Sequence, residues 1–151
     1  MWKIFILILV ILGVGGTYFM ISRDEPRRQG NFQIGEAILS VEIVEDFAKQ
    51  YQGLSGRKTL CQNCGMLFVF EKPKPQNFVM RGMNFSLDFV FINRGRVVEL
   101  VDNIPSPKQG AQPAQIISTA PADMVLEVNA GSIAKNNLKI GDQASLRLDQ
   151  Q

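Results

Sequence analysis

The chain has 151 residues, a formal net charge of +2 and no histidine. The lack of histidine excludes Ser-His-Asp and Cys-His catalysis and any His-ligated metal site. Four of the 16 Lys and Arg residues and two of the 14 Asp and Glu residues lie in the first thirty positions. The remaining residues therefore carry twelve basic and twelve acidic side chains and are neutral overall. Nucleic-acid binding needs a basic patch on the folded domain, so it is not predicted.

An uncharged apolar run lies near the start of the sequence. As a helix, Ile4–Ile21 would extend about 27 Å, close to the roughly 30 Å hydrocarbon core of a bilayer. A cleaved signal peptide should end in a small-x-small site, and Gly13-Val14-Gly15 lies inside the apolar run rather than after it. The pattern favours an uncleaved single-pass transmembrane anchor over residues 1–22, with the lipid bilayer as its partner. A signal sequence is the alternative.

The segment that follows the span is polar and contains Pro and Gly. Residues 23–32 are therefore predicted to be a linker, and residues 33–149 to be the folded domain. Apolar and polar residues alternate over Ala37–Val44, which is typical of a half-buried strand. Asp46 is expected to cap a short helix that ends near Gly53.

Further short strands are expected between turns rich in Pro, Gly and Asn. They are Leu67–Phe70, Asn77–Met80, Leu87–Ile92, Val97–Val101, Ile116–Ser118, Met124–Val128 and Ala144–Leu148. Glu71–Gln76 reads as a rigid turn, Asn93–Arg96 as a hairpin turn, Asn103–Pro113 as a long loop and Ser132–Asn137 as one helical turn. About seven strands with one or two short helices predict a mainly β (α+β) domain, a compact antiparallel β-barrel or roll.

Several segments together resemble the DUF192 family, also called UPF0127. They are QGLSGR at Gln52–Arg57, the block GMLFVFEKPKPQNFVMRGMNFSLDFVFI at Gly65–Ile92, VLEVNAG at Val125–Gly131, and Gly141-Asp142. The resemblance covers Val41–Leu146. It implies the same fold, and because the family is uncharacterised it implies no particular activity.

The side of the membrane on which the domain lies is open to two interpretations. Three Arg residues follow the span, and the positive-inside rule applied to them places the domain in the cytoplasm. Resemblance to anchored DUF192 proteins implies export, and a short N-terminal span also tethers exported domains. We expect a cell-membrane protein with an extracytoplasmic domain.

Cys61 and Cys64 form a C-x-x-C pair just before a predicted strand. In an oxidising compartment they would close a local disulfide, which is the favoured interpretation. A redox pair of the thioredoxin type opens a helix, whereas this pair precedes a strand. Two Cys supply half of a tetrahedral zinc site, so zinc would need a second chain or carboxylates, and no metal site is assigned. In a cytoplasmic domain the two thiols would be unpaired.

Three charged residues lie among apolar neighbours in the predicted strands. Arg81, Asp88 and Glu127 either belong to structural pairs, for example Asp88 with Arg81, or line a small polar cleft together with Asn103. Asp88 and Glu127 are the candidates for acid/base catalysis on a sugar. No phosphate-binding loop or cofactor motif is present, so no cofactor is predicted.

These observations favour a non-catalytic binding or accessory module of the cell envelope, with a ligand or protein partner that the sequence does not identify. The alternative is a carboxylate-dependent enzyme that acts on an envelope sugar or peptide. A thiol or shared-zinc role of Cys61 and Cys64 is the more distant alternative.

Overall fold

The computed structural model describes residues 28–148. The predicted span Ile4–Ile21 lies outside these residues. Within residues 28–148, neither helix has the length and apolar content needed to cross a membrane.

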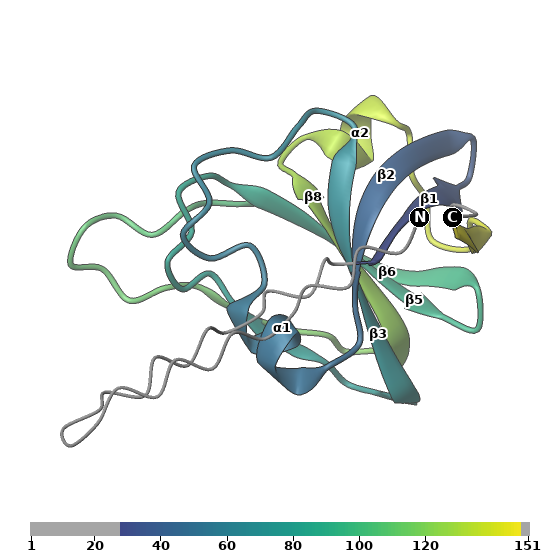
Figure 1. The fold of residues 1–151 in the computed structure, drawn as a ribbon, viewed down its shortest axis with the longest axis horizontal. Helices are drawn as coiled ribbons and strands as arrows, with labels where there is room; N and C mark the ends of the chain where they lie inside the picture. The colour runs from purple at the N-terminus through teal and green to yellow at the C-terminus, as the bar shows by residue number, and fades with distance from the viewer. Residues whose placement is uncertain (1–27, 149–151) are drawn as a thin grey trace, which may run out of the picture.

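Nine strands and two short helices make up the described domain (Figure 1). In chain order they are β1 (Arg28–Ile34), β2 (Ala37–Val44), α1 (Phe47–Gln52), β3 (Cys64–Lys74), β4 (Asn77–Val79), β5 (Leu87–Asn93), β6 (Arg96–Ile104), β7 (Gln115–Ile117), β8 (Ala122–Asn129), α2 (Ser132–Lys135) and β9 (Ala144–Leu148). The mainly β prediction is confirmed.

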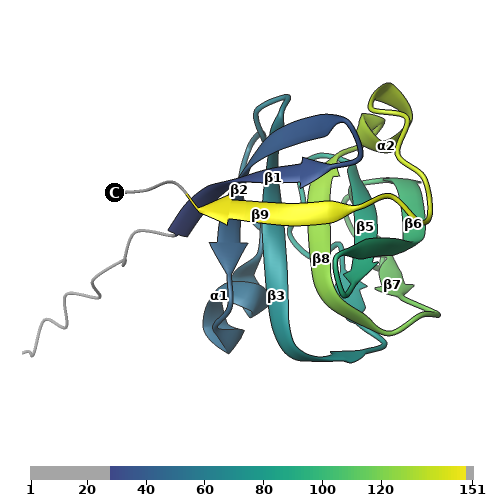
Figure 2. The same ribbon diagram turned by 90° about the vertical axis from the view of Figure 1, so that its right-hand side faces the viewer.

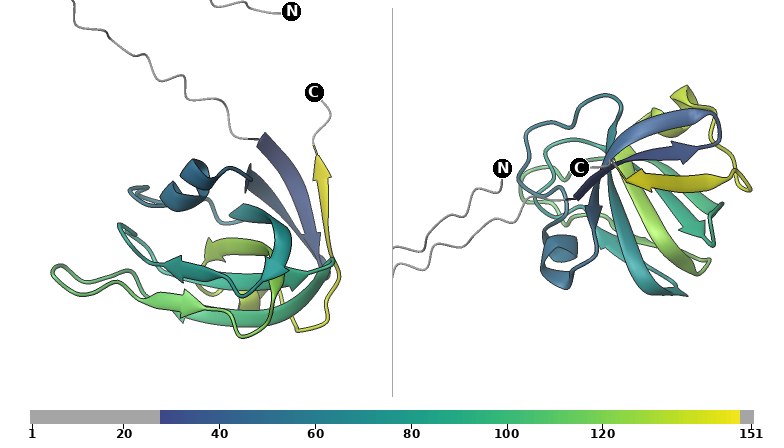
Figure 3. Two further views of the ribbon diagram at one scale, coloured as in Figure 1. Left: turned by 90° about the horizontal axis from the view of Figure 1, so that it is seen from below. Right: turned by 45° about the vertical axis from the view of Figure 1, so that its right-hand side comes forward.

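Seven strands form one curved mixed sheet in the order β6-β5-β8-β3-β2-β1-β9 (Figure 3), and β4 pairs separately with β7. The predicted antiparallel barrel is wrong in two respects. First, β2 and β3 are parallel, because the chain between them passes through α1 and a long loop and returns to the starting end of the sheet. Second, the sheet is not closed: in the described residues its edge strands approach only where Arg96 bridges Gln143, beside the turn into β9.

The central strands β3, β5 and β8 are buried on both faces, so the domain has two apolar clusters. Side chains alternate between them along each strand. In β5, Phe89 and Phe91 pack into one cluster with Phe68 and Val125, while Val90 and Ile92 pack into the other with Leu67, Leu126 and residues of β1 and β2. Phe89 and Phe91 therefore lie on one face of β5, and Val90 and Ile92 lie on the other. Burial on both faces explains why Leu87–Ile92 is almost continuously apolar.

Strand β1 begins at Arg28, inside residues 23–32, which were predicted to be a linker. Residues 28–32 therefore belong to the folded domain, and the linker prediction is wrong for them. Phe32 and Ile34 are fully buried, whereas Asn31 lies on the solvent side. The strand turns into β2 at Gly35, whose φ of +54° suits glycine. The polar residues of this stretch are its outward face, so polar composition does not distinguish it from a linker.

Helix α1 begins after Asp46 and ends at Gly53, as the sequence predicts. The side chain of Asp46 accepts a hydrogen bond from the Lys49 backbone N–H at 2.8 Å, and the helix ends at Gly53 with φ of +51°. The Gln50 side chain donates to the Val69 carbonyl at 2.9 Å, which ties the helix to β3. Strand β3 itself is longer than expected and continues through Pro73, which was assigned to a turn.

Candidate functional site

A pocket of about 310 Å³ lies where α1 and β4 cover one face of the sheet. Its size falls in the range of small-molecule sites, which are mostly apolar with a few polar groups. The apolar lining includes Leu54, Phe68, Phe70, Phe78, Met83 and Leu87. Polar side chains reach it from α1, from the end of β3 and from Arg81 after β4.

Glu127 reaches the pocket from the sheet. It lies on β8, in register with Met66 of β3 on one side and Phe89 of β5 on the other. Only 7% of Glu127 is exposed, and its carboxyl group borders the pocket. Within residues 28–148 the fully buried side-chain oxygens without a partner are Oδ1 of Asn93 and Oδ1 of Asp123, so the Glu127 oxygens are not sealed from the pocket. Burial raises the pKa of Glu127 from 4.5 to about 8. At neutral pH the pocket therefore contains an uncharged carboxylic acid.

Aromatic rings and one guanidinium group lie at the mouth of the pocket. Phe47 and Tyr51 are one helical turn apart on α1, their ring centroids 6.4 Å apart, and they are 82% and 65% exposed. The Arg81 guanidinium lies 4.1 Å from the centroid of the Tyr51 ring and donates to the Tyr51 hydroxyl at 2.9 Å. These contacts hold Arg81 beside the opening.

The structure brings Arg81 and Glu127 to one pocket but places Asp88 and Asn103 elsewhere. Asp88 is fully buried on the opposite face of the sheet, because it precedes Phe89, which shares the face of Glu127. Its carboxylate accepts backbone N–H bonds from Asn103 at 2.8 Å and from Ile133 at 2.9 Å. Asp88 therefore joins the end of β6 to the start of α2, and the four residues do not form one cleft.

Replacing Asp88 by Asn should lower the free energy of unfolding by about 2–3 kcal/mol, the cost of a lost hydrogen bond to a charged group. The amide offers one acceptor oxygen, so the N–H of Asn103 or Ile133 would face an NH₂ group. Urea denaturation measures the loss. The control is Asp102→Asn at an exposed position of β6, which should change stability by less than about 0.5 kcal/mol. Equal effects of the two variants would contradict the structural role of Asp88.

A family model matches most of the chain. The DUF192 model, described as "Uncharacterized ACR", matches residues 31–146. The chain belongs to the DUF192 family. No match was found among curated proteins.

Two crystal structures resemble this DUF192 domain. One is a protein from Sinorhizobium meliloti 1021, named as a proposed transcription regulator, with 27% sequence identity and a TM-score of 0.73 over 82% of this chain and 97% of that one. The other is a protein of unknown function from Novosphingobium aromaticivorans, with 24% identity and a TM-score of 0.70 over 87% of this chain and 99% of that one. The second likeness supports the fold alone.

Three of the four segments that carried the family resemblance contribute residues to the pocket, and Gly141-Asp142 does not. Gly53 and Leu54 end α1 and line it, and Glu127 lies in the VLEV segment of β8. Arg57, the last residue of QGLSGR, forms a bidentate ion pair with Glu42 of β2 at 2.5 and 2.7 Å. The motif of this DUF192 domain thus combines pocket residues with residues that fix the loop between α1 and β3.

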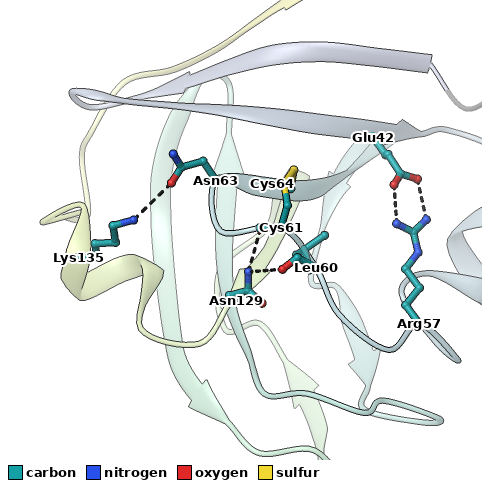
Figure 4. Close-up of a disulfide and its surroundings, with 8 residues drawn as sticks. All are labelled: Glu42, Arg57, Leu60, Cys61, Asn63, Cys64, Asn129 and Lys135. Carbon is teal, nitrogen blue, oxygen red and sulfur yellow. Dashed lines mark hydrogen bonds and ion pairs between the residues drawn. A yellow bond between two sulfur atoms is a disulfide. The ribbon is translucent and has the colours of Figure 1, made fainter.

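Cys61 and Cys64 form a disulfide in the loop that enters β3 (Figure 4). The Asn129 side chain donates to the Leu60 and Cys61 carbonyls at 3.2 and 3.0 Å, which fixes the same loop to the end of β8. Neither cysteine lines the pocket that contains Glu127. Within residues 28–148, no three His, Cys, Asp or Glu side chains are grouped so as to hold a metal ion.

The sequence did not lead us to predict Phe47 and Tyr51 at the mouth of the pocket. The signal was available: Phe47 and Tyr51 are four residues apart on a short helix whose other positions are mostly polar, so both lie on one face. On a helix of six residues, two large rings on one face either pack against the sheet or remain exposed. That choice depends on tertiary packing.

Proposed function

We propose that this DUF192 domain is a non-catalytic binding module that holds a small, mostly apolar ligand in the pocket between α1, β4 and β8. The observation that carries the proposal is Glu127, a buried residue that lines the pocket. Because the Glu127 carboxyl group borders the pocket, it can form a hydrogen bond with a ligand there.

The protonation state of Glu127 selects the polar group of the ligand. With a pKa of about 8, its carboxyl group is neutral at pH 7 and offers one O–H donor and one carbonyl acceptor. A carboxamide matches both, because its C=O accepts and its N–H donates. The apolar walls suit the body of such a ligand, and the exposed rings of Phe47 and Tyr51 suit a flat or sugar-like outer part.

We place the domain outside the cytoplasm on a membrane anchor. The uncharged run Ile4–Ile21 supports the anchor. The Cys61–Cys64 disulfide supports export, because disulfides persist in oxidising compartments. Thiol alkylation of protein isolated from its native host without reductant tests this placement: the cysteines should resist alkylation. Two freely alkylated cysteines would favour a cytoplasmic domain instead.

The enzyme alternative receives no support from this geometry. Paired-carboxylate catalysis needs both groups in one cleft, where they flank the scissile bond within about 10 Å of each other. Asp88 and Glu127 lie on opposite faces of the sheet, and Asp88 already bonds two backbone N–H groups.

The binding proposal is tested by isothermal titration calorimetry of the full chain in lipid nanodiscs, with N-acetylglucosamine and N-acetylphenylalaninamide as probes. At least one amide probe should bind, and Glu127→Leu should weaken that binding about tenfold, the equivalent of about 1.4 kcal/mol. Glu36→Gln, at an exposed position, should leave the affinity unchanged. Binding of neither probe, or equal binding by the Glu127→Leu variant, would refute the proposed pocket function.

A further inference from the structure

Helix α1 exposes two large aromatic side chains at the mouth of the pocket. Phe47 is 82% exposed and Tyr51 is 65% exposed, although large apolar side chains are normally buried. Val79 of β4, across the pocket mouth, is 47% exposed. We call Phe47, Tyr51 and Val79 the α1 face.

The chain enters the described domain next to this face. Arg28, the first residue of β1, forms an ion pair at 2.8 Å with Glu45, which immediately precedes the capping residue of α1. Figure 2 shows α1 at the same end of the molecule as the start of β1. The α1 face therefore lies beside the point where residues 1–27 join the domain.

The length of chain outside the structure limits how far this end can lie from a bilayer. Six residues, 22–27, separate the uncharged run Ile4–Ile21 from Arg28. At full extension they span about 20 Å. The headgroup layer accounts for roughly 5–8 Å of that distance. An anchored chain thus keeps Arg28, and with it the start of α1, within about 20 Å of the hydrocarbon core.

The charges around the α1 face suit an anionic lipid surface. Near α1, Glu45 is paired with Arg28, and Asp46 is paired with Lys49 at 3.5 Å. Arg81 and Lys74 line the same pocket mouth and form no ion pair within residues 28–148. Exposed aromatic rings with nearby basic side chains are the composition found where proteins meet the headgroup region.

We propose that the α1 face, Phe47, Tyr51 and Val79, docks on the lipid headgroup region of the membrane that anchors the chain. The proposal rests on the anchor given under the proposed function. Docking and ligand binding share Phe47 and Tyr51, which line the pocket mouth, whereas Glu127 serves ligand binding alone. Docking would bury the exposed rings and place Arg81 and Lys74 against lipid phosphates. It would also set the pocket mouth at the membrane surface.

Tryptophan quenching by brominated lipid tests the docking. In a Trp2→Phe background, Phe47→Trp and Val79→Trp each place a single reporter on the α1 face of the full chain. The proteins are reconstituted in phosphatidylcholine–phosphatidylglycerol vesicles with acyl chains brominated near the headgroup. Both reporters should emit at shorter wavelength than the control and lose most of their emission. The control, Ile140→Trp, replaces a residue that is 68% exposed in the turn before β9, and it should stay unquenched.

A wash of the same vesicles with alkaline carbonate separates the possible failures. In one outcome the protein stays with the vesicles, but the reporters on the α1 face are quenched no more than Ile140→Trp. This outcome would contradict the docking and would agree with the anchor. Protein that washes off would overturn the anchor and the docking together. Neither result affects the calorimetric test of the pocket, because that test turns on Glu127.

Discussion

Raising the pH from about 4.5 to 8 should destabilise the wild-type domain much more than a Glu127→Gln variant. The pKa of Glu127 is raised by burial from 4.5 to about 8, so the folded state holds a proton that the unfolded chain releases. The stability linked to this group is fully present below pH 4.5 and is lost as the pH rises through the folded pKa. The loss is about 1.4 kcal/mol per pH unit and on the order of 4–5 kcal/mol in total.

Urea denaturation of both proteins across this pH range measures the difference. Gln cannot ionise, so the free energy of unfolding of the wild type, relative to that of Glu127→Gln, should fall with rising pH at the stated slope. This difference should level off above pH 8. Glu36→Gln, which removes an exposed carboxyl group of the same type, should follow the wild type throughout. Parallel curves for wild type and Glu127→Gln would show that Glu127 is either solvated or paired in the folded protein.

Glu127→Leu extends the same argument to the trade-off between stability and binding. Leucine has a similar volume and no polar group to leave unsatisfied, so this variant should be more stable than the wild type at pH 8. The same variant should lose affinity for an amide probe. A residue that costs stability where it is buried and contributes to binding there is expected of a binding site rather than of a core position.

The sequence allowed prediction of those elements whose signals are local. The cap at Asp46, the end of α1 at Gly53 and the hairpin at Asn93–Arg96 each depend on residues close in sequence, and the structure has all three. The parallel pairing of β2 with β3 and the pairing of β1 with β9 join segments far apart in the chain. Periodicity indicates that a strand has a buried face, but it does not indicate which strand lies beside it.

The candidate site was predictable only in part, for a related reason. Arg81 and Glu127 were candidates and line the pocket. Asp88 and Asn103 were candidates and do not, because sharing a face depends on the register between β5 and β8. A shift of one residue in that register would have exchanged the faces of Asp88 and Phe89. Composition could not decide this, since β5 and β8 are buried on both faces.

Phe91→Ala should lower the free energy of unfolding by about 3–5 kcal/mol, the usual cost of truncating a buried phenylalanine. Phe91 is fully buried in the cluster beneath the pocket, and its ring centroid lies 6.3 Å from that of Phe78 and 6.5 Å from that of Phe89. Its neighbours on the central strands are held by sheet hydrogen bonds, so they cannot close the cavity that alanine leaves.

The matched control is Phe47→Ala, which deletes the same atoms from a ring that is 82% exposed on α1. In the full chain without lipid, that change should stay within about 0.5 kcal/mol of the wild type. Chemical denaturation of both variants compares the free energy lost when the same side chain is truncated at a buried and at an exposed position. A loss below about 1 kcal/mol for Phe91→Ala, well under the expected range, would mean that its ring does not pack in the core. A large loss of stability for Phe47→Ala would mean that α1 needs this ring in order to fold. It would then contradict the proposal that the ring is free to contact a lipid surface.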